Sequence, residues 1–202
     1  VVRTAVRRGV EVMAVYRGYS GLISGDIKLF DVRDVSNTIN KGGTILYSDR
    51  CDEMKTPEGL KKAVDNCHKF GIEGLICIGG DGTFRGATDL SRHGIPTVGL
   101  TGTIDNDITA TDYTIGFDTA VNTAMRAIDN IRDTASSHER CCLIEVMGRD
   151  AGWIALNAAV AGGAEVCLLP EFPYDIEKVK ELGCEGITAI SESNGILNVE
   201  TL

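Results

Sequence analysis

Two short polar stretches, each directly after an apolar run, carry the residues best suited to chemistry. GGDGT (79–83) follows LICI and sets Asp81 among glycines, and TGTIDNDITATD (101–112) carries Asp105 and Asp107. Glycine lets a backbone approach a ligand closely, and the N–H groups at the start of a helix attract anions. A carboxylate among phosphates usually holds a bridging Mg²⁺, because it would otherwise repel them. We therefore interpret GGDGT as a phosphate site with a metal at Asp81.

The second stretch and a group of arginines add to this interpretation. Alternating carboxylates such as Asp105 and Asp107 suit a general base and a neighbour that positions it or the metal. Arg132, Arg140 and Arg149 flank the apolar run CCLIEV, and arginines at strand ends can clamp a phosphate through paired N–H donors. From the residues alone, ordinary explanations stay open: a glycine-rich turn with a capping carboxylate, a solvated acidic loop and solvated surface arginines.

The chain around these stretches alternates between helices and strands. A buried strand over 75–78, a helix around 85–92 and a strand over 96–100 predict a βαβ unit. A long helix over 118–132 follows, and the alternation continues beyond it. This order predicts an α/β fold with parallel sheets and helices on both faces, in which both carboxylate stretches lie at the carboxyl ends of strands.

One helix is delimited especially clearly. TPEGLKKAVDNCHKFG has Thr56 as N-cap, Pro57 at the first helical position and Gly71 as the stop. The unusually long polar stretch over 101–116 further predicts a domain change near Gly116.

Composition excludes several classes of protein. The net charge of -9 at pH 7 argues against binding of nucleic acid or of an anionic membrane. No apolar run approaches the roughly 20 residues that cross a bilayer, and the first residues lack a signal-peptide core, so we expect a soluble, cytoplasmic protein. The seven cysteines are odd in number and lack C-x-x-C spacing, which predicts reduced core residues rather than a metal site or disulfide framework.

Five motifs, in this order, closely resemble those of 6-phosphofructokinases of the bacterial ATP-dependent type: IGGDGT, GTIDND, TIGFDTA, RDTASSH and EVMGR. The resemblance covers essentially residues 1–175. It implies two similar Rossmann-like domains, a nucleotide-binding domain over 1–116 and the first part of a sugar-phosphate-binding domain over 117–202. It also implies transfer of the γ-phosphoryl group of Mg·ATP to the 1-hydroxyl of fructose 6-phosphate in glycolysis, by an allosteric homotetramer that binds a nucleotide effector.

The resemblance also assigns site residues one by one. The catalytic group matches Asp105 as the base, together with Thr103, Asp107 and Arg149. Asp81 matches the Mg²⁺ position, and the other ATP contacts match Arg50, Cys51, Gly80, Gly82 and Thr83. The sugar-phosphate contacts match Thr103, Ile104, Asp105, Met147, Gly148, Arg149, Glu192 and, from a neighbouring subunit, Arg140. The allosteric nucleotide site matches Arg3, Arg132, Gly163 and Glu165.

Glycines at two positions favour ATP as the phosphoryl donor. Pyrophosphate-using relatives typically carry a bulkier Asp and Lys where this chain has Gly82 and Gly102. Glycine leaves room for a nucleotide that bears adenosine. A pyrophosphate-dependent enzyme, or another GGDGT kinase such as a kinase of NAD or of diacylglycerol, stays as an alternative.

The resemblance is also to a longer protein. The family's first strand and glycine-rich turn have no counterpart before Val1, and its carboxyl-terminal portion, with an Arg and a His–Arg group around the sugar phosphate, has none before Leu202. We therefore expect the 202-residue chain by itself to be a fragment with little or no activity. The alternative from another class is a non-catalytic nucleotide-binding module.

Overall fold

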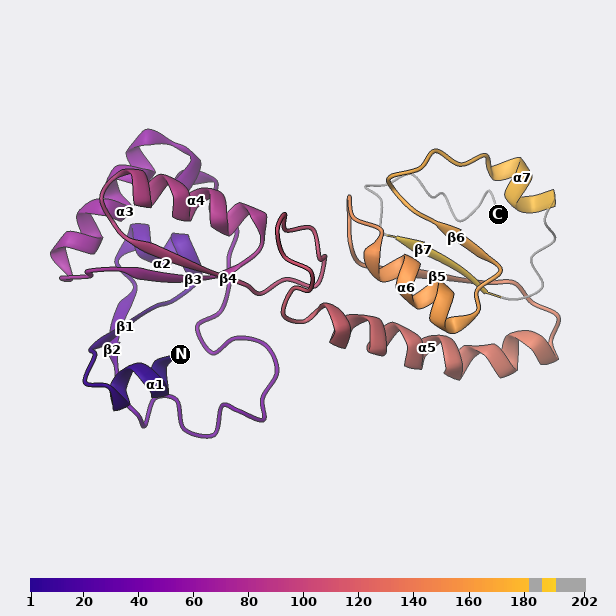
Figure 1. Ribbon diagram of the computed structural model, residues 1–202, viewed down its shortest axis with the longest axis horizontal. Coiled ribbons are helices and arrows are strands. Elements are labelled where there is room, and N and C mark those ends of the chain that lie inside the picture. The colour runs from indigo at the N-terminus through magenta and orange to yellow at the C-terminus, as the bar shows by residue number, and fades with distance from the viewer. Residues whose placement is uncertain (182–186, 192–202) are drawn as a thin grey trace. The chain divides into compact units, whose positions relative to one another are not determined.

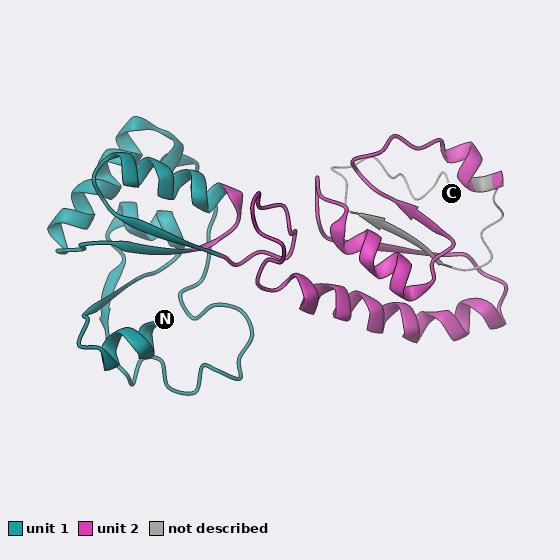
Figure 2. Cartoon of the chain, viewed as in Figure 1, with its two compact units in different colours: residues 1–77, 82–100 teal, residues 78–81, 101–202 magenta. Residues whose placement is uncertain are grey.

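The computed structural model describes residues 1–181 and 187–191, whose helices and strands are drawn in Figure 1. They form two compact units, which Figure 2 distinguishes by colour. Unit 1 comprises residues 1–77 and 82–100, and unit 2 comprises residues 78–81 and those from 101 onward. The division into functional domains at residue 116 stays a prediction. The combination of helices and sheets confirms the predicted α/β class.

The elements up to residue 101 alternate largely as predicted. They are α1 (Val2–Arg7), β1 (Val12–Val15), α2 (Gly18–Ser24), β2 (Ile27–Phe30), the 3-10 helix η1 (Asp52–Lys55), α3 (Pro57–Lys69), β3 (Leu75–Gly79), α4 (Asp81–Arg92) and β4 (Thr97–Thr101). Strand β3 pairs with β4. This pair, with α4 between its strands in the chain, is the βαβ unit that the sequence predicts.

Helix α3 begins and ends where its flanking residues predict. The Oγ1 atom of Thr56 accepts a hydrogen bond from the N–H of Gly59 at 3.1 Å, and Pro57 is the first helical residue. Gly71, just beyond the helix, has a φ of +65°. Ala63 and Cys67 on the apolar face are completely buried in the core of unit 1.

Strands β1 and β2 depart from the predicted parallel arrangement. They pair antiparallel, with Val12 opposite Phe30 and Val15 opposite Ile27. The connection over residues 16–26 contains only the short helix α2, and a crossover to a parallel strand needs about a dozen residues or more. The chain therefore turns back on itself and forms a hairpin.

The core of unit 1 lies between its helices and the β3–β4 pair. Its largest cluster of buried side chains consists of Leu22, Met54, Ala63, Cys67, Leu90 and Ile95. Burial raises the pKa of both Cys67 and Cys77, so these thiols stay protonated core groups, as predicted. Cys141 is exposed instead, directly before the first residue of the next strand.

Unit 2 contains a three-stranded sheet with helices packed on it. Its elements are α5 (Phe117–Ser137), β5 (Cys142–Val146), α6 (Trp153–Gly162), β6 (Val166–Leu168), α7 (Ile176–Glu181) and β7 (Ile187–Ser191). Strand β7 lies between β5 and β6 and is parallel to both. Ile128 of α5 and Ala158 of α6 are fully buried against each other's helices. In the described part of the chain, no helix combines the length and apolar character needed to cross a membrane.

Candidate functional site

The GGDGT segment joins strand β3 to helix α4 with almost no loop. Strand β3 ends at Gly79 and α4 begins at Asp81, so Gly80 alone separates them. The helix therefore starts four residues before the predicted start at Arg85, and Gly82 and Thr83 lie in its first turn. The first N–H groups of a helix have no partner within it and attract anions. This turn can therefore bind a phosphate group.

Unit 2 contains residues 79–81 of the first carboxylate stretch and the whole of the second, and the two lie close together there. A Cβ atom at Gly80 would lie 3.5 Å from both Cβ and Oγ1 of Thr103, which is ordinary contact. The loop after β4 approaches β3 more closely still at Gly102, where a Cβ atom would lie 2.8 Å from Cγ2 of Ile78. Glycine at 102 thus serves the packing of this loop on β3, in addition to any space it leaves for a ligand.

The loop over 101–116 carries both predicted catalytic carboxylates. Asp105 is partly buried, whereas Asp107 is exposed. The N–H of Asp105 donates a hydrogen bond to Oγ1 of Thr103 at 3.3 Å. At the far end of the loop, the N–H of Ile115 donates to the carbonyl oxygen of Thr101 at 2.7 Å. The loop is therefore closed on itself, with Asp105 close to Thr103, the residue that a Cβ atom at Gly80 would contact.

Tyr19 supports the first turn of α4, and the sequence does not predict this role. Its hydroxyl donates a hydrogen bond to the carbonyl oxygen of Thr83 at 2.5 Å. Burial raises the pKa of Tyr19 far above its usual value, so the hydroxyl keeps its proton. A Cβ atom at Gly86 would lie 2.6 Å from the Tyr19 ring. The available signal was Gly86 itself, because glycine inside a helix is unfavourable unless something packs closely against it.

The remaining predicted ATP contacts lie before helix α3. Arg50 is exposed, and Cys51 is partly buried against the core cluster of unit 1. Both belong to unit 1, as do Gly82 and Thr83. Arg50 is thus available to solvent and to an anion.

Four of the predicted sugar-phosphate residues flank strand β5. Arg140 is exposed just before the strand, and Met147, Gly148 and Arg149 follow it. Arg149 has a φ of +51°, an uncommon conformation for a residue with a side chain. Its Nε lies 3.1 Å from Oδ2 of the exposed Asp150, and such a surface ion pair is weak. Glu192 lies outside the described residues.

Two of the four predicted allosteric residues lie together. A Cβ atom at Gly163 would lie 3.5 Å from one terminal nitrogen of Arg132. Gly163 ends helix α6 with a φ of +60°, and Glu165 follows two residues later, just before β6. Arg3 is exposed on α1, in unit 1, whereas the other three belong to unit 2.

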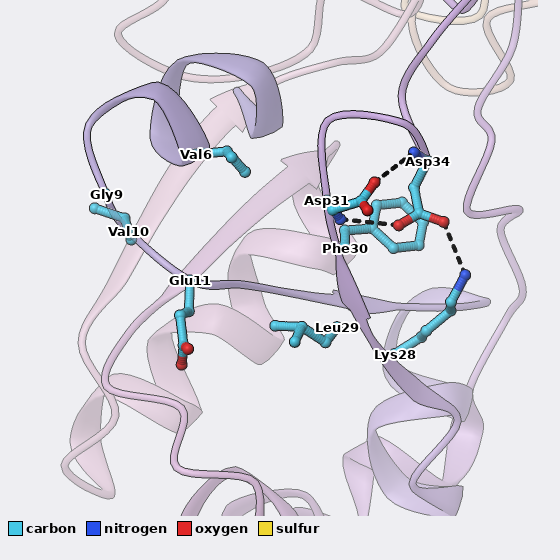
Figure 3. Close-up of a pocket in the computed structure, with 9 residues that line it drawn as sticks. All are labelled: Val6, Gly9, Val10, Glu11, Lys28, Leu29, Phe30, Asp31 and Asp34. Carbon is cyan, nitrogen blue, oxygen red and sulfur yellow. Dashed lines mark hydrogen bonds and ion pairs between the residues drawn. The ribbon is translucent and has the colours of Figure 1, made fainter.

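A cavity of about 580 Å³ lies elsewhere, between α1 and the β1–β2 hairpin (Figure 3). The residues that line it are Val6, Gly9, Val10, Glu11, Lys28, Leu29, Phe30, Asp31 and Asp34. Lys28 pairs with Asp34 at 2.8 Å. Three carboxylates and one paired lysine disfavour a phosphate group here, and none of the predicted site residues lines this cavity.

The described residues contain no group of three His, Cys, Asp or Glu side chains that could hold a metal ion. Mg²⁺ needs no such group, because it is usually bound by one or two carboxylates together with the phosphates of a substrate. Asp81, at the start of α4 beside N–H groups suited to phosphate, fits that mode of binding. Gly80 and Asp81 also lie in the same compact unit as Thr103 and Asp105.

Known proteins match nearly the whole chain. The ATP-dependent 6-phosphofructokinase of Halalkalibacterium halodurans is 58% identical over 179 residues, which cover 89% of this chain and 56% of the relative. The ATP-dependent 6-phosphofructokinase 1 of Thermus thermophilus is 59% identical over 183 residues, which cover 90% of this chain and 57% of the relative. The chain thus spans about half the length of the curated relatives it matches.

Solved structures and a family-wide comparison agree with these relatives. The crystal structure of Pichia pastoris phosphofructokinase superposes with a TM-score of 0.83 at 32% identity, covering 95% of this chain and 25% of that chain. The sequence model of the family described as Phosphofructokinase matches residues 1–197. The fold, the two adjoining carboxylate loops and these matches lead to one conclusion: the chain belongs to the phosphofructokinase family.

Proposed function

We propose that the full-length protein transfers the γ-phosphoryl group of Mg·ATP to the 1-hydroxyl of fructose 6-phosphate, giving fructose 1,6-bisphosphate and ADP. The observation that supports this most is the proximity of Gly80 and Thr103: a Cβ atom at position 80 would lie 3.5 Å from Cβ and Oγ1 of Thr103. It joins a phosphate-binding helix start to a loop that carries a candidate base. The reaction needs both parts side by side, since phosphoryl transfer depends on positioning and charge stabilisation.

Asp105 takes the proton of the 1-hydroxyl as that oxygen bonds to the γ-phosphorus, and the bond from this phosphorus to the oxygen of the leaving ADP breaks. Asp107 supports the base, and Thr103 and Ile104 contact the sugar. The N–H groups of the first turn of α4 bind the nucleotide phosphates. The further contacts in this proposal are Arg50 and Cys51 with ATP, Met147, Gly148 and Arg149 with the sugar phosphate, and Arg140 with the 6-phosphate in a neighbouring subunit.

Mg²⁺ would be held at Asp81 together with the phosphates of ATP, in keeping with its usual binding by few protein carboxylates. It would supply neutralisation of the phosphate charge. The protein itself orients the phosphates of ATP, through the backbone N–H groups of Gly82 and Thr83. These groups do so whether or not the metal fully neutralises the phosphate charge.

Regulation and assembly complete the proposal. A nucleotide effector binds near Arg132, Gly163 and Glu165, where a guanidinium lies beside the end of helix α6. Arg3 joins that site from a neighbouring subunit of a cytoplasmic homotetramer. The bound effector is expected to contact the guanidinium of Arg132 and the backbone at the end of helix α6.

The proposed reaction is tested by a coupled assay on the full-length protein, with fructose 6-phosphate and either ATP or pyrophosphate. Turnover with Mg·ATP is expected. Turnover with pyrophosphate but none with ATP would overturn the proposed donor. Calorimetry with Mg·ATP and with fructose 6-phosphate tests the alternative of a non-catalytic nucleotide-binding module. Such a module would bind Mg·ATP but not the sugar phosphate, and the full-length protein would not phosphorylate the sugar phosphate either.

Substitution of Gly82 by alanine should separate ATP binding from folding. A Cβ atom at Gly82 meets no atom within 4 Å in the protein, and alanine is favoured over glycine in a helix by about 1 kcal/mol. The thermal midpoint should therefore stay or rise. Because the new methyl group stands where the phosphates approach the turn, the KM for ATP should rise about tenfold, equivalent to about 1.4 kcal/mol.

Gly42→Ala is the matched control for this prediction. A Cβ atom there also meets nothing within 4 Å, and Gly42 lies outside the proposed site. Its KM for ATP should equal that of the wild-type protein. Equal KM values for both variants would contradict the assignment of Gly82 to the nucleotide turn.

A further inference from the structure

The residue between Asp105 and Asp107 holds their loop closed. Oδ1 of Asn106 accepts a hydrogen bond from the backbone N–H of Thr114 at 2.9 Å and another from the Thr114 hydroxyl at 3.3 Å. Nδ2 of Asn106 donates to the carbonyl oxygen of Asp112 at 3.3 Å. One side-chain amide therefore ties the middle of the loop to two positions near its end.

Thr114 makes this connection difficult to replace. It is only 4% exposed, and both its backbone N–H and its hydroxyl donate to the same oxygen of Asn106. A buried donor that loses its acceptor is strongly unfavourable, because water cannot take the acceptor's place. Conformations in which Asn106 turns away from Thr114 are therefore disfavoured.

The backbone of Asn106 matters as much as its side chain. Its φ of +54° lies in the left-handed region, which asparagine adopts more readily than most residues with side chains. This conformation redirects the chain directly after Asp105, whose own N–H is held by Oγ1 of Thr103 at 3.3 Å. The direction of the Asp105 side chain thus depends on the residues on both sides of it.

We propose that Asn106 is a positioning residue, which holds Asp105 in place to accept the proton of the sugar hydroxyl. The inference rests on the proposed function for the identity of the reaction. Asn106 acts through the loop and not on the substrate, because its amide is already engaged with Thr114 and Asp112. A displacement of about 1 Å in a reacting group can lower a rate about 100-fold.

Asn106→Gly is the variant of choice in the full-length protein. Glycine adopts the same positive φ without strain but lacks the amide, so only the connection to Thr114 and Asp112 is lost. The kcat should fall about 10- to 100-fold, while the KM for ATP stays within about twofold, because the nucleotide turn is untouched. Asn122→Ala is the control: Asn122 is exposed on α5, and its Nδ2 donates to the carbonyl oxygen of Asp118 at 2.8 Å.

A double-mutant cycle separates positioning through this contact from a general loss of stability. Thr114→Val removes the hydroxyl but keeps the backbone N–H, so it should lower kcat less than Asn106→Gly does. The double variant should lose no more kcat than Asn106→Gly alone, because both changes act on one contact. A kcat within twofold of wild type for Asn106→Gly, or additive losses in the double variant, would overturn the proposal.

Amide hydrogen exchange tests the same contact without any turnover. The N–H of Thr114 should exchange at least about tenfold faster in Asn106→Gly, because its acceptor is gone. The N–H of Ile115, which donates to Thr101, should keep its protection. Unchanged exchange at Thr114 would refute the loop closure itself. Absence of turnover in the wild-type protein would instead refute the proposed function, and the positioning role with it, even where exchange shows that the loop is closed.

Discussion

Replacement of Asp105 by asparagine in the full-length protein is expected to lower kcat by about 10²- to 10⁴-fold, the usual contribution of a positioned general base. Asparagine has nearly the same shape as aspartate but cannot accept the proton of the 1-hydroxyl at pH 7. The KM for fructose 6-phosphate should change little, because the loss falls on the transition state. A coupled assay for ADP release measures both parameters.

The fold should survive this substitution. Asparagine keeps the shape of aspartate and the backbone N–H that donates to Oγ1 of Thr103. Asp129→Asn, at an exposed position on α5, is the control and should leave kcat unchanged. Near-normal turnover of Asp105→Asn, at an unaltered thermal midpoint, would remove Asp105 from the role of base.

Gly59→Ala should have the largest effect on folding of the variants considered. A Cβ atom at Gly59 would lie 2.0 Å from the carbonyl oxygen of Glu53 and 2.6 Å from its carbonyl carbon. These are backbone atoms of η1, which cannot turn aside as the end of a side chain can. Excess volume in a packed site costs about 1–3 kcal/mol, and we expect a loss of about 3 kcal/mol in the free energy of unfolding because α3 or η1 must move as a whole.

Urea unfolding followed by circular dichroism measures this loss. Gly42→Ala is again the control, since a Cβ atom there meets no atom within 4 Å. It should be neutral or more stable by about 0.4–1 kcal/mol, through the reduced entropy of the unfolded chain. If Gly59→Ala unfolds at the same urea concentration as Gly42→Ala, then η1 does not pack on α3 in solution as it does in the structure.

Local sequence signals predicted the helices whose ends are marked by capping residues. The bounds of other elements depend on contacts between residues far apart in the chain. Helix α3 was predictable from Thr56 and Pro57, whose effects are confined to its first turn. The start of α4 was not, because Gly82 disfavours a helix and the compensating contact comes from Tyr19, far away in the chain. Helix α2 was not predicted, because GYSGLISGD, which contains it, reads locally as a turn-rich loop, and strand β2, which follows directly, was not predicted either.

The candidate site also has features that the sequence predicts and features that it does not. That GGDGT and the Asp105 loop adjoin was predictable, because both follow neighbouring strands of a βαβ unit and share one edge of the sheet. The role of Asn106 was not, since it depends on a positive φ and on which way the loop turns back toward Thr114. Spacing in a sequence predicts which strand ends adjoin, whereas the path of a long loop depends on contacts that form only when it closes.

The order of strands in unit 2 has a consequence for synthesis of the chain. Strand β7 is the last of the three to be made, yet it lies in the centre of the sheet and is the hydrogen-bonding partner of both β5 and β6. On the ribosome, β5 and β6 therefore emerge with open edges that nothing can pair until residues 187–191 have followed them. Such edges attract strands of other chains. Slow translation while β5 and β6 have emerged and residues 187–191 are still inside the ribosome should prolong that state and increase aggregation of the nascent protein, whereas a pause after these residues have emerged should not.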